Sequence, residues 1–220
     1  MSQVMKRYLT DPEQKKLLST IRQFADVPAR RDSAWVSLLI STGMRVGEFS
    51  RMTVGDARAA LRTGYIFIPR EHRKGQRADH EVLVTVPVRA ALEQLLEIHC
   101  NVDGGGEDDS PLVLSRKGCA LTIRAYQQRV ELWSKMAGLP EGVSPHWFRH
   151  TRAMNIMRKT TSNDPRGIAQ AALGHVSIGS TAIYTATSRE DLEKALNEVD
   201  GAGRVRLPQL RKEYEGRVGV

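Results

Sequence analysis

Between residues 65 and 87 of this sequence, the apolar residues recur at every second position, as in a β-strand, and not at the spacing of a helix. Residues 65–69 and 81–87 are rich in Val, Ile, Tyr and Phe, which is typical of two strands of an antiparallel sheet. The segments on either side repeat apolar residues at helical spacing. The sequence therefore predicts a mixed α/β fold that is mainly α-helical and contains one small antiparallel sheet.

Turn and cap residues divide the helical segments. The predicted helices begin near residues 10, 30, 88, 122, 145, 165 and 189. Thr10 has the chemistry of an N-cap, Pro28 is expected to break the first helix after Phe24, and Gly43 and Gly174 are expected C-caps. Residues 101–110 are rich in Gly and Asp and are predicted to form a surface loop. We expect a basic arm over residues 1–9 and a tail over residues 200–220.

The charge balance favours a polyanionic partner. The 220 residues contain 33 Lys and Arg against 25 Asp and Glu, a formal net charge of +8. Nucleic acid is a better candidate than a membrane, because no secretory signal, membrane-length apolar run or basic amphipathic helix is present. Cys100 and Cys119 match no metal-binding spacing. A reducing, cytoplasmic compartment is the default expectation, with association to the nucleoid if the partner is DNA.

The octapeptide at residues 144–151 contains the clearest chemical signal. His146 and Arg149 lie three residues apart just after Pro145, a spacing that places both near one face at the start of a helix. Arg149 offers a planar fork of donors suited to phosphate oxygens, and His146 can donate or move a proton near neutral pH. A helix start with one surface Arg and one packed His is the alternative interpretation.

Two other basic positions stand out. Arg45 begins a short helix after Gly43, where a cation is electrostatically disfavoured unless an anion lies nearby, and Glu48 is placed to orient it. The alternative for Arg45 is a capping or surface residue. The link between the two strands is also basic and contains Arg70, Arg73, Lys74 and Arg77 around Gly75. Such a link is either a solvated loop or a device that brings a flexible ammonium to a phosphate.

These segments together resemble the tyrosine recombinases, the phage integrase family. The resemblance spans about residues 8–199 and rests on five motifs in the family's order: residues 42–48 (TGMRVGE), 74–75 (KG), 146–151 (HWFRHT), 173–175 (LGH) and 183–185 (IYT). It implies the catalytic-domain fold of that family over residues 10–199. Larger members have an additional N-terminal domain, so the resemblance suggests a single-domain member, like the small recombinases of fimbrial phase variation, or a truncated chain.

The resemblance also implies a role for each motif residue. Arg45 and Arg149 would bind the scissile phosphate with help from His146 and His175, Lys74 would be the general acid, Tyr184 the nucleophile and Glu48 a supporting residue. DNA contacts are expected from Arg70, Arg73, Arg77 and His150. The chemistry is coherent, because a tyrosine ester conserves the bond energy of the phosphodiester and fixed cations stabilise the developing charge. No metal or nucleotide cofactor is expected.

The expected partner is double-stranded DNA, with self-association into a dimer or tetramer on it. The expected activity is site-specific cutting and rejoining of DNA through a 3′-phosphotyrosyl intermediate. Two alternatives remain at this point. One is a DNA-binding regulator that retains the fold without turnover, against which the full set of six residues argues. The other is relaxation of DNA supercoils in the manner of a type IB topoisomerase.

Overall fold

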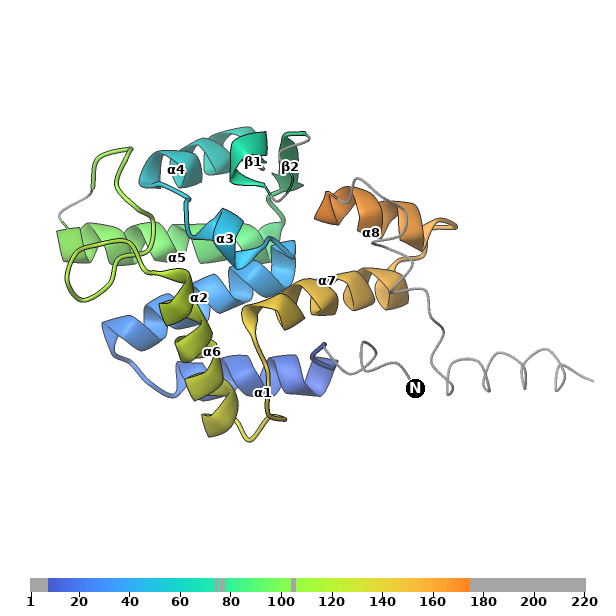
Figure 1. The fold of residues 1–220 in the computed structure, drawn as a ribbon, viewed down its shortest axis with the longest axis horizontal. Helices are drawn as coiled ribbons and strands as arrows, with labels where there is room; N and C mark the ends of the chain where they lie inside the picture. Colours follow the sequence, from blue (N-terminus) through green and yellow to red (C-terminus); the bar gives the residue numbers. More distant parts are fainter. Residues whose placement is uncertain (1–7, 74, 76–77, 104–105, 175–220) are drawn as a thin grey trace, which may run out of the picture. The chain divides into compact units, whose positions relative to one another are not determined.

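A computed structural model describes residues 8–73, 75, 78–103 and 106–174 of the chain. Its elements in chain order are α1 (Asp11–Arg22), α2 (Val27–Thr42), α3 (Val46–Phe49), α4 (Val54–Thr63), β1 (Tyr65–Ile68), a 3₁₀ turn η2 (Arg70–His72), β2 (His80–Leu83), α5 (Val86–Asp103), α6 (Ile123–Met136), α7 (Pro145–Lys159) and α8 (Pro165–Leu173). The predicted fold class, mainly helical with one small antiparallel sheet, is confirmed (Figure 1).

Helix α2 is the centre of the core, because it is buried on nearly every side. It packs against α1, α5 and α7, and Figure 1 shows it running through the middle of the helices. Trp35 of α2 is fully buried and meets Tyr126 of α6 edge-on, with ring centroids 5.0 Å apart. The helix ends at Gly43, which has a φ of 70° that other residues rarely adopt. The predicted C-cap at Gly43 is confirmed.

The two strands form a short hairpin. Tyr65 pairs with Leu83 and Ile68 with His80 in antiparallel register. Ile66 and Val82 face each other and are buried, whereas Tyr65 and Leu83 are exposed, so one face of the hairpin packs on the core. The second strand is shorter than the sequence suggested, because Val86 and Pro87 already begin α5. Strand β2 also contacts α8.

The start of the chain corrects one prediction. Helix α1 ends at Arg22, before Phe24, and Pro28 lies in the first turn of α2 instead of breaking α1. Proline is favoured there because the first helical N–H groups have no intrahelical partner. Asp26 is the N-cap of α2, and its carboxylate accepts a 2.9 Å hydrogen bond from the Ala29 amide. Phe24 is 38% exposed.

Two helices were missed or shortened by the sequence analysis. Helix α4 was not predicted, although the Thr53 hydroxyl accepts from the Asp56 amide at its start and Gly64 ends it. Helix α5 continues to Asp103, so part of the predicted loop at residues 101–110 is helical. The predicted helix at residues 189–199 and the predicted tail lie outside the described residues. Among the described residues, no helix is long and apolar enough to cross a membrane.

Candidate active site

Arg45 and Glu48 form an ion pair at the start of α3. The Arg45 guanidinium donates a 2.8 Å hydrogen bond to Glu48 Oε1, and the Arg45 amide donates to Glu48 Oε2 at 2.9 Å. The Arg45 side chain is 31% exposed, whereas the Glu48 side chain is 3% exposed. The buried carboxylate thus holds the arginine at a helix N-terminus, where its charge would otherwise be disfavoured. The orienting contact predicted for Glu48 is confirmed.

The core fixes the position of this pair. Phe49 follows Glu48 directly, is fully buried, and meets the Tyr126 ring at a centroid distance of 5.8 Å. Tyr126 in turn contacts Trp35 of α2. A helix of four residues has little stability of its own, so this aromatic packing fixes α3 and the pair that it carries.

Arg149 of α7 joins two segments that are distant in sequence. Its side chain points inward, the residue is 3% exposed, and it donates to the carbonyl oxygens of Gly43 at 2.8 Å and Leu173 at 2.7 Å. Gly43 precedes Arg45 by two residues, so these bonds bring the two predicted phosphate-binding arginines to one end of α2. A Cβ added at Gly43 would lie 2.4 Å from Leu173 and 3.0 Å from Arg152, so this approach requires glycine.

The C-terminal end of α8 is capped by side chains from three other segments. His80 Nε2 lies 3.3 Å from the carbonyl oxygen of Ala172, and Arg149 donates to that of Leu173 at 2.7 Å. Arg73 donates to the carbonyl oxygen of Gly174. The last carbonyls of a helix have no intrahelical donors and carry partial negative charge, so cationic and N–H donors are favoured there.

Arg73 and Arg70 differ although both belong to the basic link. Arg70 is exposed, as expected of a DNA contact, whereas Arg73 is 8% exposed and directs its donors to backbone carbonyls. The Nε atom of Arg73 also lies 4.0 Å from Glu48 Oε1. The two arginines therefore have different surroundings, which the sequence pattern did not distinguish.

His80 was not singled out from the sequence as a site residue. Burial lowers the pKa of its imidazole below the usual range, and the nearby charge of Arg73 lowers it further. A neutral His80 with its proton on Nε2 donates to the Ala172 carbonyl. Its position at the end of the basic link, at the first residue of β2, was the only available signal.

His146 and His150 lie one turn apart on α7. Their rings meet edge-on with centroids 4.4 Å apart. His146 is exposed and His150 is half-buried, whereas Arg149 between them is buried. His146 therefore lies nearer the solvent than Arg149. Four predicted site residues, Lys74, Arg77, His175 and Tyr184, lie outside the described residues, although Arg73 and Gly174 are the direct chain neighbours of two of them.

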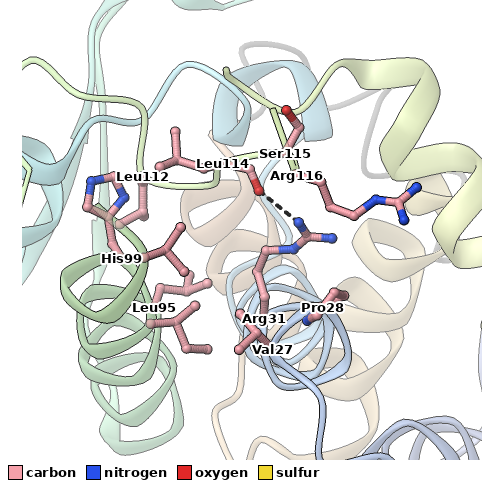
Figure 2. A pocket seen from close by; sticks show the side chains of 11 residues that line it. Val27, Pro28, Arg31, Leu95, His99, Leu112, Leu114, Ser115 and Arg116 are labelled. Carbon is pink, nitrogen blue, oxygen red and sulfur yellow. Dashed lines mark hydrogen bonds between the residues drawn. The ribbon is translucent and has the colours of Figure 1, made fainter. Parts of the chain in front are cut away.

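A pocket of about 470 Å³ lies elsewhere, at the other end of α2 (Figure 2). It is lined mainly by apolar residues from the start of α2, the end of α5 and residues 112–116. Arg31 points along it but donates to the Leu114 carbonyl at 2.7 Å. Val27 is separated from Gly43 by 16 residues of α2, or about 24 Å of helix, so the pocket is distinct from the arginine cluster. Within the described ranges, no group of three or more His, Cys, Asp or Glu is arranged to hold a metal ion.

The chain is similar to known proteins over most of its length. Residues 7–191 match the Phage integrase family. A tyrosine recombinase XerC from Shewanella amazonensis is 30% identical over 220 residues, covering 93% of this chain and 66% of the relative. One from Methylobacterium nodulans is 32% identical over 172 residues, covering 78% of this chain and 49% of the relative.

Solved structures give the same result. The crystal structure of XerA recombinase superposes with a TM-score of 0.69 at 26% identity, covering 90% of this chain and 64% of that one. A XerH site-specific recombinase bound to its difH substrate gives a TM-score of 0.67 at 25% identity, covering 88% and 53%. This chain spans about half to two thirds of the length of these relatives. Because the family match covers residues 7–191 and the relatives and solved structures agree with it, this chain belongs to the phage integrase family.

Proposed function

We propose that this chain is the catalytic domain of a tyrosine-type site-specific DNA recombinase, which cuts and rejoins double-stranded DNA through a covalent 3′-phosphotyrosyl intermediate. The observation that carries the proposal is that Arg45 and Arg149 lie at the same end of α2. Arg45 is held there by Glu48, and Arg149 by the carbonyl oxygens of Gly43 and Leu173. The names of the relatives, tyrosine recombinases, support it.

The electrostatics of the cluster suit a phosphate in its transition state. Among the described residues, three guanidiniums, those of Arg45, Arg73 and Arg149, accompany one buried carboxylate, that of Glu48, which leaves an excess of two positive charges. A phosphodiester carries one negative charge and its phosphorane transition state carries two. Fixed cations in a partly buried site stabilise that added charge more than they would in water.

Each residue then has a defined task. Tyr184 loses its phenolic proton to solvent, and the phenoxide attacks the phosphorus to form a 3′-phosphotyrosine, while the bond to the 5′-oxygen breaks and that oxygen takes a proton from Lys74. Arg45 and Arg149 bind the non-bridging oxygens, His146 and His175 donate to them, and Glu48 supports Arg45. Arg149 is buried in the free protein, so its phosphate contact requires a local rearrangement when DNA binds.

DNA affinity would come from the basic surface. We assign backbone phosphate contacts to Arg70, Arg77 and His150, and we expect affinity to fall steeply as salt rises, because phosphate contacts release counterions. An affinity independent of salt would point to a different partner. On DNA the protein would act as a dimer or tetramer, in the cytoplasm and in association with the nucleoid.

The proposal is tested by incubating the protein with nicked DNA that carries a candidate site, followed by a denaturing gel. A covalent protein–DNA adduct is expected from the wild type and none from Tyr184→Phe, which loses only the phenolic oxygen and should bind DNA as before. DNA binding without an adduct would indicate a regulator. Relaxed circles without recombinant joints would indicate an activity like that of a type IB topoisomerase.

A further inference from the structure

Among the described residues of the basic link between the two strands, Arg73 is the one that is buried. Its side chain is 6% exposed. One terminal nitrogen donates to the carbonyl oxygens of Ala78 at 2.6 Å and Asp79 at 3.2 Å, and the other donates to Gly174. The guanidinium thus connects the two ends of the basic link and also bonds the link to the end of α8.

The contact between the hairpin and α8 is closely fitted. A Cβ added at Gly174 would lie 2.5 Å from the Arg73 guanidinium and 2.8 Å from the His80 ring. Gly174 also has a φ of 60°, so both its conformation and its surroundings require glycine. Two of the three carbonyls at this helix end, those of Ala172 and Gly174, meet donors of the hairpin. The hairpin therefore fixes where the chain leaves α8.

Arg73 also approaches the partner of Arg45. Its Nε–H is buried without a hydrogen-bond acceptor, and Glu48 Oε1 lies 4.0 Å away. A buried donor without an acceptor is unfavourable, and a shift of about 1 Å would close a bond to Glu48. The same guanidinium is thus close to the hairpin, the end of α8 and the Arg45–Glu48 pair.

The residues that follow Arg73 and Gly174 in the chain are two of the predicted catalytic residues. Lys74 directly follows Arg73, and His175 directly follows Gly174. The Arg73–Gly174 hydrogen bond therefore joins the backbone beside the general acid of the proposed reaction to the backbone beside one of its phosphate donors.

We propose that Arg73 is a positioning residue, not a DNA contact: it fastens the hairpin to the end of α8 and so places Lys74 to protonate the leaving 5′-oxygen. This inference rests on the proposed function. An error of about 1 Å in the placement of a catalytic group slows a reaction by on the order of 100-fold. Loss of Arg73 should therefore impair the proton transfer that Lys74 performs, with DNA binding retained.

The test compares two nicked DNA substrates, one with the normal 5′-bridging oxygen and one with sulfur at that position. Sulfur departs as a thiolate without a proton, so it bypasses general acid catalysis. On oxygen, we expect Arg73→Ala to form adduct about 100-fold more slowly than the wild type. On sulfur, it should recover most of that loss, as Lys74→Ala should, whereas Arg45→Ala should remain slow on both because its phosphate charge is not neutralised.

Two further variants make the comparison specific. Arg73→Lys keeps the charge but cannot reach three carbonyls with one ammonium, so it should behave like Arg73→Ala. Arg62→Ala removes an exposed arginine of α4 and matches the loss of charge, and its cleavage should equal that of the wild type. Equal slowing of Arg73→Ala on oxygen and sulfur, or a normal rate on oxygen, would overturn the proposal.

A second measurement separates this inference from the proposed function. In hydrogen exchange of the DNA-free protein, Arg73→Ala should speed exchange both in residues 78–80 and in residues 172–174, because their shared fastening is lost. Arg73→Lys serves if the alanine variant does not fold. If the wild type forms no adduct, the proposed function fails, and exchange alone decides the fastening: unchanged exchange in either segment would reject it.

Discussion

Two buried carboxylates, Asp32 and Glu48, each lie within 4.0 Å of two arginine side chains, but their surroundings differ. Asp32 is fully buried and accepts from Arg31 and Arg129, and also from the indole N–H groups of Trp35 at 2.9 Å and Trp133 at 2.8 Å. Within the described part of the chain, the hydrogen-bond donors to Glu48 are the side chain and amide of Arg45, and the Arg73 Nε atom lies 4.0 Å from Glu48 Oε1.

The difference separates a structural cluster from one suited to binding. At Asp32, both oxygens are saturated by donors that come from α2 and α6, so the cluster fastens two helices. At Glu48, the paired Arg45 is 31% exposed and Arg73 retains an unbonded Nε–H. A cluster whose donors exceed its acceptors has capacity left for an anion, and a saturated one does not.

The largest expected effect comes from breaking the saturated cluster. Asp32→Asn keeps the shape but leaves two arginines beside a neutral amide, and we expect it to lower the free energy of unfolding by about 3–5 kcal/mol. Urea denaturation measures this loss. Below the melting transition, adduct formation per folded molecule should stay at the wild-type rate. If Asp32→Asn instead lost cleavage with unchanged stability, the Asp32 cluster would not be purely structural, and the contrast with the Glu48 cluster would be wrong.

Arg45→Lys tests the open cluster with the charge conserved. An ammonium cannot form the forked pair of bonds to two phosphate oxygens, so adduct formation should fall by about 100-fold, or about 2.7 kcal/mol in the barrier. The melting temperature should change little, because Lys still pairs with Glu48. Quench-flow or manual sampling on denaturing gels gives the rate. Wild-type cleavage in this variant would make Arg45 a surface cation.

Gly43→Ala tests the approach of α7 and α8 to the end of α2. A Cβ there meets Leu173 at 2.4 Å, and the φ of 70° is unfavourable for alanine. We expect a loss of about 1–3 kcal/mol in stability together with reduced cleavage, since the Gly43 carbonyl holds Arg149. Gly64→Ala is the matched control, with a φ of 80° and nothing within 4 Å, so it should lose stability but retain cleavage.

The smallest effect concerns pH. Because the pKa of His80 is lowered in the folded protein by burial and by Arg73, the unfolded chain takes up a proton that the folded protein resists. This contribution to stability is present above the usual histidine pKa, near 6.5, and declines as pH falls below it. Melting curves between about pH 8 and pH 5 should show a shallower decline for His80→Gln than for the wild type. If the stability of both proteins declined equally with pH, His80 would not be the source of this pH dependence.

Local sequence determined most of the element boundaries. The caps at Thr10, Gly43 and Gly174 and the helix starts near residues 122 and 145 lie where predicted, because their hydrogen bonds and backbone angles involve residues within one turn. The failures were local as well: Pro28 was interpreted as a helix breaker although it lies in a first turn, and the Thr53–Asp56 start of α4 was overlooked.

Tertiary structure alone decided which charges are buried. Arg70 and Arg73 belong to one basic run, yet only Arg73 reaches Gly174, which lies 101 residues away. Arg149 binds Gly43 across 106 residues, and Arg129 binds Asp32 across 97. Charge and residue type can be obtained from the sequence. Whether a guanidinium meets water, a carbonyl or a carboxylate depends on how distant helix ends pack together, because burying a charge is favourable only where its partners are already in place.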